Sequence, residues 1–599
     1  MFLPPFRGYR ANSTFVRFGE INCSNAIPRE NMRKNSVARW SLSLAALILI
    51  SCGCNLFATT YYWDTNGATA GSGAADGTWD SSVSALWTTD ATGASATQAV
   101  TTVSTDSLIF SAGANGSAGT ITVNGTQLAQ YITISQSGLT FQGGAIGSSA
   151  ATVSATIGAS AIINSQFNGN FSFSNANQAV TLGGGGSFNG FLTGAGNSTA
   201  ALNVTSGSYT LANTARFNFG STSNPSATGV TIGSGVTFNA ASNNTSWIGY
   251  GGDGVVKLAG GTWIQPTYGL AIGRGSTSAL MIITSGSLIS NAAQIDRGIT
   301  VGAEGTSGNA TLDMRGGVIT TNYLNIGSIP NATSTRTALL VVSGGTTNAD
   351  TLTLGNGYSG AAINGSGTLA ISDGLVNIGT GGIVNGASTS GSFKASIVLS
   401  GGTLGSYNGA SWGSAMDMTL ATGSNGNVTF KPDTGKTVTL QGNLTGSGGL
   451  NVGGGTLILS GVNAYHGLTA ISAAAVLQIN GTQTIFLANL GGAAFSGLGQ
   501  LQLNGTINFD FSSLTPTDGD SWTIFGSDLL GNITFNNANW LSGFTDQGGG
   551  IWSNGADYYF NQNNGVLSYN MIPEPSVLAL FGTGMMVLTV SVLRYRRKA

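Results

Sequence analysis

Apolar and polar residues alternate with a period of two in short segments that recur from about residue 247 onward. Each segment ends in Gly, and successive final glycines are separated by 24, 29, 25, 28 and 24 residues. Strict alternation predicts β-strands with one apolar face. The segments are 247–249, 270–273, 299–302, 324–327, 352–355 and 376–379.

A second unit, a strand that ends in a Gly turn, lies between these segments, at 258–262, 314–318, 342–345 and 399–403. A repeat of this length with two or three short strands is typical of one coil of a parallel β-helix. A single coil cannot bury its inward Ile, Val and Leu, so coils must stack. We therefore predict an all-β fold, a right-handed parallel β-helix. The alternative is an array of β-sandwiches with Gly-rich hairpins.

Aromatic residues cluster at both ends of the repeat region. Trp63, Trp79 and Trp87 lie in a Gly-rich setting near the start, and we expect them to cap the open first coil; the alternative is a carbohydrate-stacking surface. The sequence thus predicts an N-terminal cap with the first coils at 59–240, β-helix repeats at 241–515 and a C-terminal cap at 516–570. The aromatic residues of the second cap are Trp522, Phe525, Trp540, Phe544, Trp552, Tyr558, Tyr559 and Phe560.

The N-terminal region has the order of a secretory signal. A basic segment at 32–39 precedes an apolar run at 40–50. We predict a signal peptide at 32–58 with an N-terminal helix, cleaved after Ala58, and expect residues 1–31 to be untranslated or disordered. The alternative is a lipoprotein signal in which Cys52 is lipidated.

The C-terminal region predicts a transmembrane helix. Residues 576–593 form an 18-residue stretch without a charge, which is the lower limit for a membrane span. The basic residues after it predict a cytoplasmic end, so the preceding body lies outside. These stop-transfer residues are Arg594, Arg596, Arg597 and Lys598.

Pro573, Glu574 and Pro575 directly precede the apolar stretch. The prolines make this tripeptide extended, which suits a protease or transpeptidase cleft. The order of Pro-Glu-Pro, apolar helix and basic cluster over 571–599 resembles the PEP-CTERM sorting signal. That resemblance implies recognition through Pro573, Glu574 and Pro575, and removal of the tail by an exosortase. The alternative is a permanent single-span anchor.

Residues 444–480 resemble the autotransporter-associated β-strand repeat. The matching positions include Asn463, Tyr465 and the 455–457 Gly-Thr-Leu strand, whereas His466 stands where a small polar residue is usual. The family is associated with β-helical surface proteins, so the resemblance implies the same solenoid.

Composition and charge narrow the classes of protein. Charged residues are 7% and hydrophobic residues 41% of the chain, which excludes disorder driven by high charge. The 94 Gly lack a three-residue period and Pro numbers only 10, which excludes collagen. Seven of the 20 basic residues precede residue 59 and four end the chain, leaving nine against 19 acidic residues between 59 and 570. This body therefore lacks the basic footprint of a nucleic-acid-binding protein.

The candidate chemistry is sparse. The three cysteines precede residue 59 and His466 is the one histidine, so the usual zinc ligand sets cannot form. The 518–520 Asp-Gly-Asp turn is too short for a calcium loop. Paired carboxylates in an outer groove would indicate a polysaccharide-cleaving enzyme. The candidates are Asp253, Asp296 with Arg297, Glu304, and Asp313 with Arg315.

We expect these charges to be isolated loop charges, and we predict a non-enzymatic protein without cofactor or metal. The predicted function is that of an exported, exosortase-sorted protein of the cell surface or extracellular matrix, structural or adhesive and associated with exopolysaccharide. The C-terminal helix would hold it in the membrane before processing. The alternative is a secreted β-helix polysaccharide lyase or hydrolase.

Overall fold

The computed structural model describes residues 58–570 except 176, 195–198, 212–215, 241–244, 276–277, 295–296, 304–306, 328–335, 356–363, 387–391 and 489. The predicted signal peptide up to residue 57 with its helix, the sorting residues Pro573, Glu574 and Pro575, the C-terminal helix and the basic residues at 594–598 lie outside the described residues, whereas Ala58 is described. Within the described part of the chain, no helix is long and apolar enough to cross a membrane.

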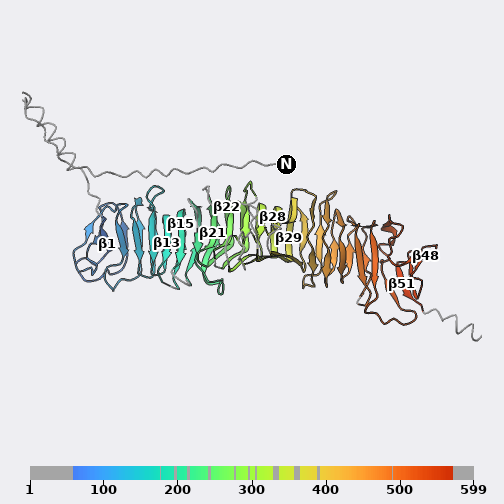
Figure 1. Cartoon of the computed structure of the whole chain (residues 1–599). Coiled ribbons are helices and arrows are strands. Elements are labelled where there is room, and N and C mark those ends of the chain that lie inside the picture. The colour runs from blue at the N-terminus through green and yellow to red at the C-terminus, as the bar shows by residue number, and fades with distance from the viewer. Residues whose placement is uncertain are drawn as a thin grey trace, which may run out of the picture. The chain divides into compact units, whose positions relative to one another are not determined.

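The described body is built almost entirely of short strands that pair in parallel with strands one coil away (Figure 1). The strands of the first coils are β1 (Thr60–Trp63), β2 (Gly77–Trp79), β3 (Ala85–Thr88), β4 (Gln98–Ala99), β5 (Ser107–Phe110), β6 (Gly119–Val123), β7 (Thr126–Gln127), β8 (Tyr131–Ile134), β9 (Leu139–Gln142), β10 (Ala145–Ile146), β11 (Val153–Ile157), β12 (Ala161–Ile163), β13 (Gln166–Phe173), β14 (Ala179–Leu182), β15 (Gly186–Gly194), β16 (Ala201–Val204), β17 (Gly207–Leu211), β18 (Arg216–Asn218), β19 (Gly229–Gly233) and β20 (Val236–Asn239).

In the middle coils some strands run around a corner and serve two or three faces of the solenoid. The corner-rounding strands are β22 (Gly254–Gln265), β24 (Ala279–Ser290), β27 (Val318–Ile326), β28 (Thr337–Leu354) and β29 (Ser366–Asn385). The shorter strands among them are β21 (Ser246–Tyr250), β23 (Leu270–Arg274), β25 (Ile299–Val301), β26 (Asn309–Met314), β30 (Lys394–Leu399) and β31 (Thr403–Ser406).

The later coils return to short strands, one to a face. They are β32 (Trp412–Ser414), β33 (Met418–Leu420), β34 (Val428–Lys431), β35 (Thr437–Leu440), β36 (Leu444–Gly446), β37 (Leu450–Val452), β38 (Thr456–Leu459), β39 (Val462–Tyr465), β40 (Thr469–Ile471), β41 (Val476–Ile479), β42 (Thr482–Phe486), β43 (Phe495–Ser496), β44 (Gln500–Leu503) and β45 (Thr506–Asp510).

Each coil places one strand in each of three columns, which β28 shows within a single element. Its residues 337–342 pair with β26 and define the first column. Residues 346–349 and 351–354 pair with successive parts of β27 and define the second and third columns. All three parts pair on their other side with β29. The strands are therefore in register from coil to coil, as a parallel solenoid requires.

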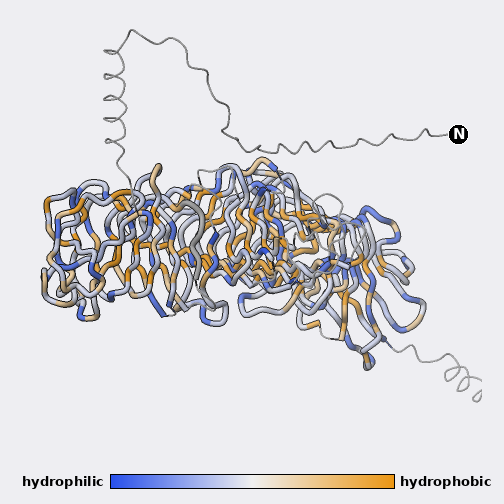
Figure 2. The backbone as a smooth tube through the Cα atoms, turned by 60° about the vertical axis from the view of Figure 1, so that its left-hand side comes forward, coloured by the Kyte–Doolittle hydropathy of each residue, from blue (hydrophilic) through white to orange (hydrophobic). Residues whose placement is uncertain are grey.

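Apolar side chains are buried along each column, and Figure 2 shows hydrophobic stretches of backbone recurring from coil to coil. In the first column the register aligns apolar residues at equivalent positions of successive coils, and every residue of this row is buried. Parallel pairing of equivalent positions confirms the predicted solenoid and rules out the alternative of hairpin-built sandwiches for this region. The row is Leu258, Ile283, Met314, Val342, Ile371 and Leu399.

One predicted repeat was assigned to the wrong position. Segments 324–327 and 352–355 lie in the third column, but 376–378 pair with 347–349 in the second column. The third-column strand of that coil is 382–385, opposite Thr351–Leu354. The error has a simple cause: every face uses the same alternation of inward apolar and outward polar residues, so the pattern alone does not identify the column.

Glycines at the corner between the first and second columns make the tight turn possible. Gly317, Gly345, Gly374 and Gly402 follow equivalent strands and have φ of 72°, 71°, 76° and 72°. This left-handed conformation is costly for residues with a Cβ atom. The recurring Gly of the second sequence unit is therefore explained by backbone geometry.

The two ends of the described body depart from the parallel pattern. At the start, β1 pairs antiparallel with β3, and Trp63, Trp79 and Trp87 are buried against one another and against Phe110. At the other end an antiparallel sheet packs aromatic residues inward. Its elements, with the neighbouring ones, are β46 (Ser521–Thr523), the 3-10 helix η3 (Leu530–Asn532), β47 (Ile533–Phe535), β48 (Thr545–Asp546), β49 (Ile551–Ser553), β50 (Tyr558–Asn561) and β51 (Val566–Tyr569).

Substituting Gly345 with Ala should destabilise its coil more than the same change at Gly426. A Cβ on Gly345 would lie 2.6 Å from the carbonyl carbon of Gly316 and 2.7 Å from the oxygen of Gly317. Gly426 also has a positive φ, +83°, but nothing lies within 4 Å of an added Cβ. Both variants carry the conformational cost of about 1–2 kcal/mol, and only Gly345→Ala adds overpacking of about 1–3 kcal/mol.

Amide hydrogen exchange measures this difference as the free energy of local opening, in β28 for Gly345→Ala and in β34 for Gly426→Ala. Equal losses in the two variants would contradict the close packing of coils at this corner.

Candidate functional site

The structure describes four of the six predicted catalytic candidates and brings none of them into a carboxylate pair. Asp296 and Glu304 lie outside the described residues. Asp313 forms an ion pair with Arg315, with Nη2 and Oδ2 2.6 Å apart. Its hydrogen bond and charge raise the pKa of Arg315. Asp253 accepts a hydrogen bond of 2.9 Å from the backbone N–H of Ser278.

The register gives the separation of Asp253 and Asp313. Asp253 directly precedes Gly254, which aligns with Ala279 and Ala310 in the next two coils. Asp313 therefore lies four positions along the strand and two coils away. At ~3.3 Å per residue and ~4.8 Å per coil, the two Cα atoms are roughly 16 Å apart. Glycoside hydrolysis uses carboxyl groups about 5–10 Å apart, so this pair does not have a glycosidase geometry.

The other candidate residues make contacts that belong to the fold. His466 stacks on Phe486, with ring centroids 3.8 Å apart. The Oδ2 of Asp520 accepts a hydrogen bond from the N–H of Thr517 and closes a local turn. Within the described residues, no three His, Cys, Asp or Glu side chains converge as metal ligands would.

The three N-terminal tryptophans are at most 1% exposed, so they offer no stacking surface to a sugar. The repeat-matching residues near His466 are also interior. Asn463 is buried and accepts a hydrogen bond from the N–H of Leu444, and the hydroxyl of Tyr465 lies 2.6 Å from that of Thr469. Burial raises the pKa of Tyr465. Asn463 thus joins two successive coils, whereas Tyr465 makes its contact within its own coil.

Partly exposed aromatic residues and arginines meet instead on the outer side of the third column. Arg216 in β18 and Trp247 in β21 occupy the same register position on successive coils, as do Tyr250 and Arg274. The guanidinium carbon of Arg216 lies 3.9 Å from the ring centre of Tyr250, and that of Arg274 lies 4.0 Å from the ring centre of Trp247.

A further contact of this kind lies one coil on, at the entry to the third-column strands, where Arg297 lies over Tyr268 at 4.3 Å. We call the six residues the arginine–aromatic strip. Such cation–π contacts hold the guanidinium groups in place on the surface. The members are Arg216, Trp247, Tyr250, Tyr268, Arg274 and Arg297.

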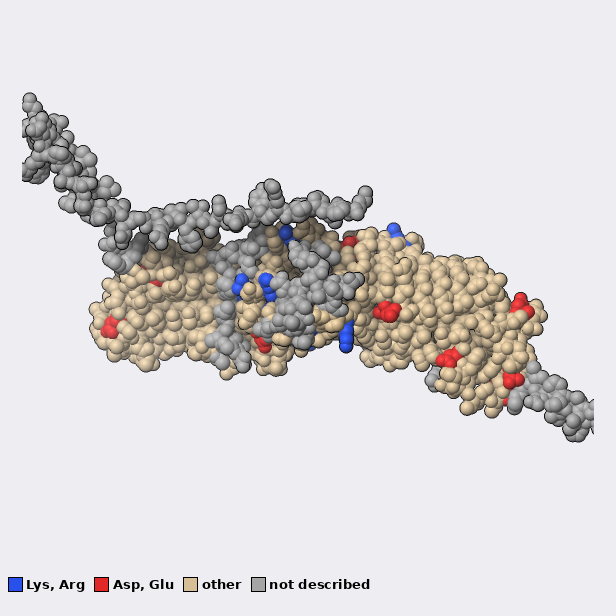
Figure 3. Space-filling view, viewed as in Figure 1, with Lys and Arg blue, Asp and Glu red and all other residues tan. Residues whose placement is uncertain are grey.

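The strip lies in the part of the body where the basic residues gather (Figure 3). Residues 59–215 contain five acidic and no basic residues, and residues 437–570 contain six acidic and no basic ones. All nine basic residues of the body therefore fall between 216 and 436. Lys257 is among them; its ammonium donates a 3.3 Å hydrogen bond to the carbonyl of Ser226, and burial lowers its pKa.

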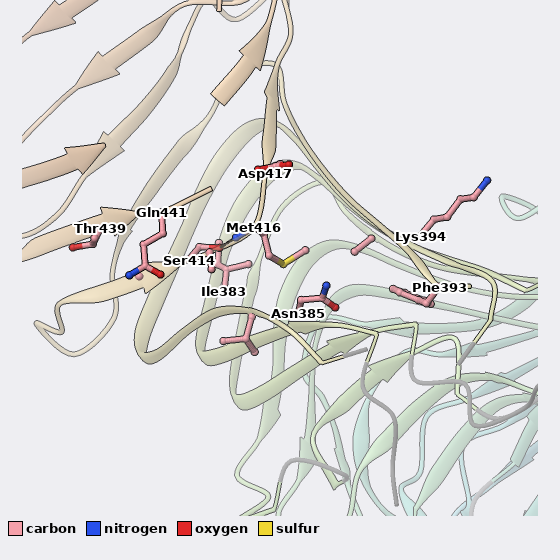
Figure 4. Close-up of a pocket in the computed structure, with 13 residues that line it drawn as sticks. Ile383, Asn385, Phe393, Lys394, Ser414, Met416, Asp417, Thr439 and Gln441 are labelled. Atoms are coloured by element: carbon pink, nitrogen blue, oxygen red, sulfur yellow. Dashed lines mark hydrogen bonds between the residues drawn. The ribbon is translucent and has the colours of Figure 1, made fainter. Parts of the chain in front are cut away.

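A second surface feature is a cleft of about 990 Å³ between β29 and β32 (Figure 4). Both strands belong to the third column, yet among the described strands none of the pairings joins them, and the ladder of this column restarts at β32. The backbones still meet at one end, where a Cβ on Gly382 would collide with the carbonyl oxygen of Gly413. The cleft is therefore a wedge that opens toward Asn385.

The wedge has a mixed lining. Ile383, Phe393 and Met416 supply apolar surface, and Lys394 extends away from them (Figure 4). Asp417 accepts a 2.7 Å hydrogen bond from the N–H of Asn443 in the next coil, so its carboxylate is already engaged. The cleft interrupts the solenoid without gathering catalytic groups.

Sequence reasoning missed both features. The confinement of basic residues to 216–436 was a visible signal for the arginine–aromatic strip. No comparable signal marked the wedge, because β29 and β32 each follow the ordinary alternation.

Comparison with known proteins yields one partial similarity. No family model matches the chain, and no solved structure matches it. A segment of 129 residues, 21% of this chain, is 41% identical to a protein of Brucella suis biovar 1 (strain 1330) named adhesin BmaC autotransporter. The segment makes up 4% of that relative, so the chain spans a small fraction of the protein it matches.

Backbone amides of β32 should exchange with solvent faster than those of β35. β35 is paired on both sides, with β32 and with β38, whereas among the described strands none pairs with β32 on the side of the wedge. Unpaired amides exchange through smaller openings. Exchange rates from overlapping peptides covering 412–414 and 437–440 test this; equal protection would show that the third column is continuous across the wedge.

Proposed function

We propose that this chain is an exported protein of the cell surface or extracellular matrix, structural or adhesive in role and associated with exopolysaccharide. The stacked parallel solenoid is the observation that carries the proposal. Its backbone groups are paired between coils and its apolar residues are interior, so the body is a rigid scaffold with outward Ser, Thr and Asn. We infer a right-handed solenoid, because parallel crossovers strongly favour that hand.

One comparison supports display outside the cell, and the composition of the body is compatible with it. The 129-residue segment is similar to part of a protein named as an autotransporter adhesin. Residues 59–570 contain no cysteine, so the body needs no particular redox compartment to fold. A non-enzymatic role fits the separation of Asp253 from Asp313 and the ion pair that occupies Asp313.

The delivery route is part of the proposal. A signal peptide at 32–58, cleaved after Ala58, would start export. The helix at 576–593 and the basic residues Arg594, Arg596, Arg597 and Lys598 would hold the chain in the membrane. An exosortase would then recognise Pro573, Glu574 and Pro575 and release the body from the tail.

Processing is tested by intact mass and terminal peptides of the protein recovered from envelope and medium of its host. The native chain should begin near Thr59 and lack Arg594–Ala599. A Glu574→Ala variant should keep the tail and accumulate in the membrane fraction, because the recognised carboxylate is gone. The matched control is Asp546→Ala, which removes an exposed carboxylate in β48 and should be processed normally.

Retention of residues 594–599 in the native protein would contradict sorting and leave a simple anchored protein. Recovery of the chain in the cytoplasm, with its N-terminal region intact, would contradict export.

A further inference from the structure

We infer that the arginine–aromatic strip is the glycan-binding surface of this protein and that its ligand is an acidic polysaccharide. The inference deepens the proposed function and rests on it, because a body delivered outside the cell is the one that meets such polymers. The anionic groups would be carboxylates or sulfates along the polymer.

The first argument is the spacing of the strip. Its residues come from four successive coils: β18, β21, the segment leading into β23 with β23 itself, and the segment leading into β25. At ~4.8 Å per coil, the strip extends roughly 14 Å along the solenoid axis while it crosses the third column from the ends of its strands at Arg274 to their entry at Arg297. A row of this kind offers several weak contacts to a linear polymer, and repeated contacts raise its apparent affinity above that of a single small anion.

The second argument is the state of the guanidinium groups. The guanidinium carbons of Arg216, Arg274 and Arg297 each lie over a ring, at 3.9, 4.0 and 4.3 Å from its centre. Stacking restricts the side chain before a ligand arrives, so less conformational entropy is lost on binding. A guanidinium has five N–H donors, more than one protein partner occupies, and their planar fork matches a carboxylate or sulfate.

The third argument is the charge of the surrounding body. Residues on both sides of the basic region, 59–215 and 437–570, carry acidic side chains alone. The middle coils, 216–436, contain nine basic and eight acidic residues and are nearly neutral, and Figure 3 shows Lys and Arg side chains there. An anionic polymer is therefore repelled least by the coils that carry the strip.

The geometry favours a polysaccharide over a nucleic acid. Single-stranded nucleic acids bind by stacking bases on aromatic faces. In this protein arginines already cover the two rings. Arg216 lies over Tyr250, and the guanidinium carbon of Arg274 lies 5.1 Å from the ring centre of Tyr250 and 4.0 Å from that of Trp247.

The test uses the full chain recovered from its host, with affinity electrophoresis in gels containing polygalacturonate, dextran sulfate, neutral dextran or duplex DNA. The native protein should be retarded by polygalacturonate or dextran sulfate and not by neutral dextran, and retardation should fall as salt increases. Preference for the first or second probe identifies the anionic group as carboxylate or sulfate.

Two double variants separate the strip from general charge. Arg216→Gln with Arg274→Gln should weaken binding roughly tenfold or more, because two charge-assisted forks are lost. Lys431→Gln with Lys436→Gln removes the same charge from a later coil and should change binding less than about twofold. Arg216→Lys with Arg274→Lys keeps the charge but loses the planar fork, and should recover only part of the affinity.

Several outcomes would overturn the inference: no retardation of the native protein by either acidic polymer, equal losses in the two Gln variants, full recovery with Lys, or stronger retardation by DNA. Circular dichroism of each variant confirms that the coils are intact. Surface labelling of intact host cells separates the two claims. A labelled protein that does not bind acidic polymers refutes only the inference about the strip. A protein that stays unlabelled inside the cell refutes the proposed function.

Discussion

The in-register stacking of one coil on the next is the constraint on which the rest of the structure depends. A single coil has strands too short and too few to bury its own apolar residues. When coils align, each backbone strand pairs with equivalents above and below, and rows such as Leu258 to Leu399 become continuous. Insertions that would disturb this alignment must therefore lie at the corners between columns or in the outer loops, whose lengths vary from coil to coil.

This constraint explains both the composition and the surface. Tight corners between columns require glycine, as at Gly345 and its equivalents. Outward positions need only be polar, so a low-charge surface of Ser, Thr and Asn suffices. The same alignment brings outward residues of different coils into rows, which places Arg216 beside Trp247 although 31 positions separate them in the sequence. A solenoid can thus build a linear binding surface without any local motif.

Most of the fold could be predicted from the sequence, but little of the arrangement of surface residues could. The alternation at 258–262 and 342–345 predicted strands, and their recurrence predicted coils that the pairing confirms. The prediction that 376–379 lies in the same column as the other Gly-terminated segments was wrong, because all three faces share one alternating pattern. The wedge after β29 and the strip were not predicted, since they depend on which outward residues meet across coils of uneven length. Periodicity identifies buried positions, whereas exposed neighbours follow from register.

Disulfide formation between engineered cysteines tests the register most directly, since residues 59–570 contain no native cysteine. Leu339, Thr368 and Ser396 occupy one outward row on three successive coils. Cysteines at 339 and 368 should be ~4.8 Å apart at Cα, within the range for a disulfide, whereas those at 339 and 396 should be roughly twice as far and beyond it. The account predicts a bond in the first double variant and none in the second. Failure of the first pair, or equal bonding in both, would contradict the stacked parallel solenoid.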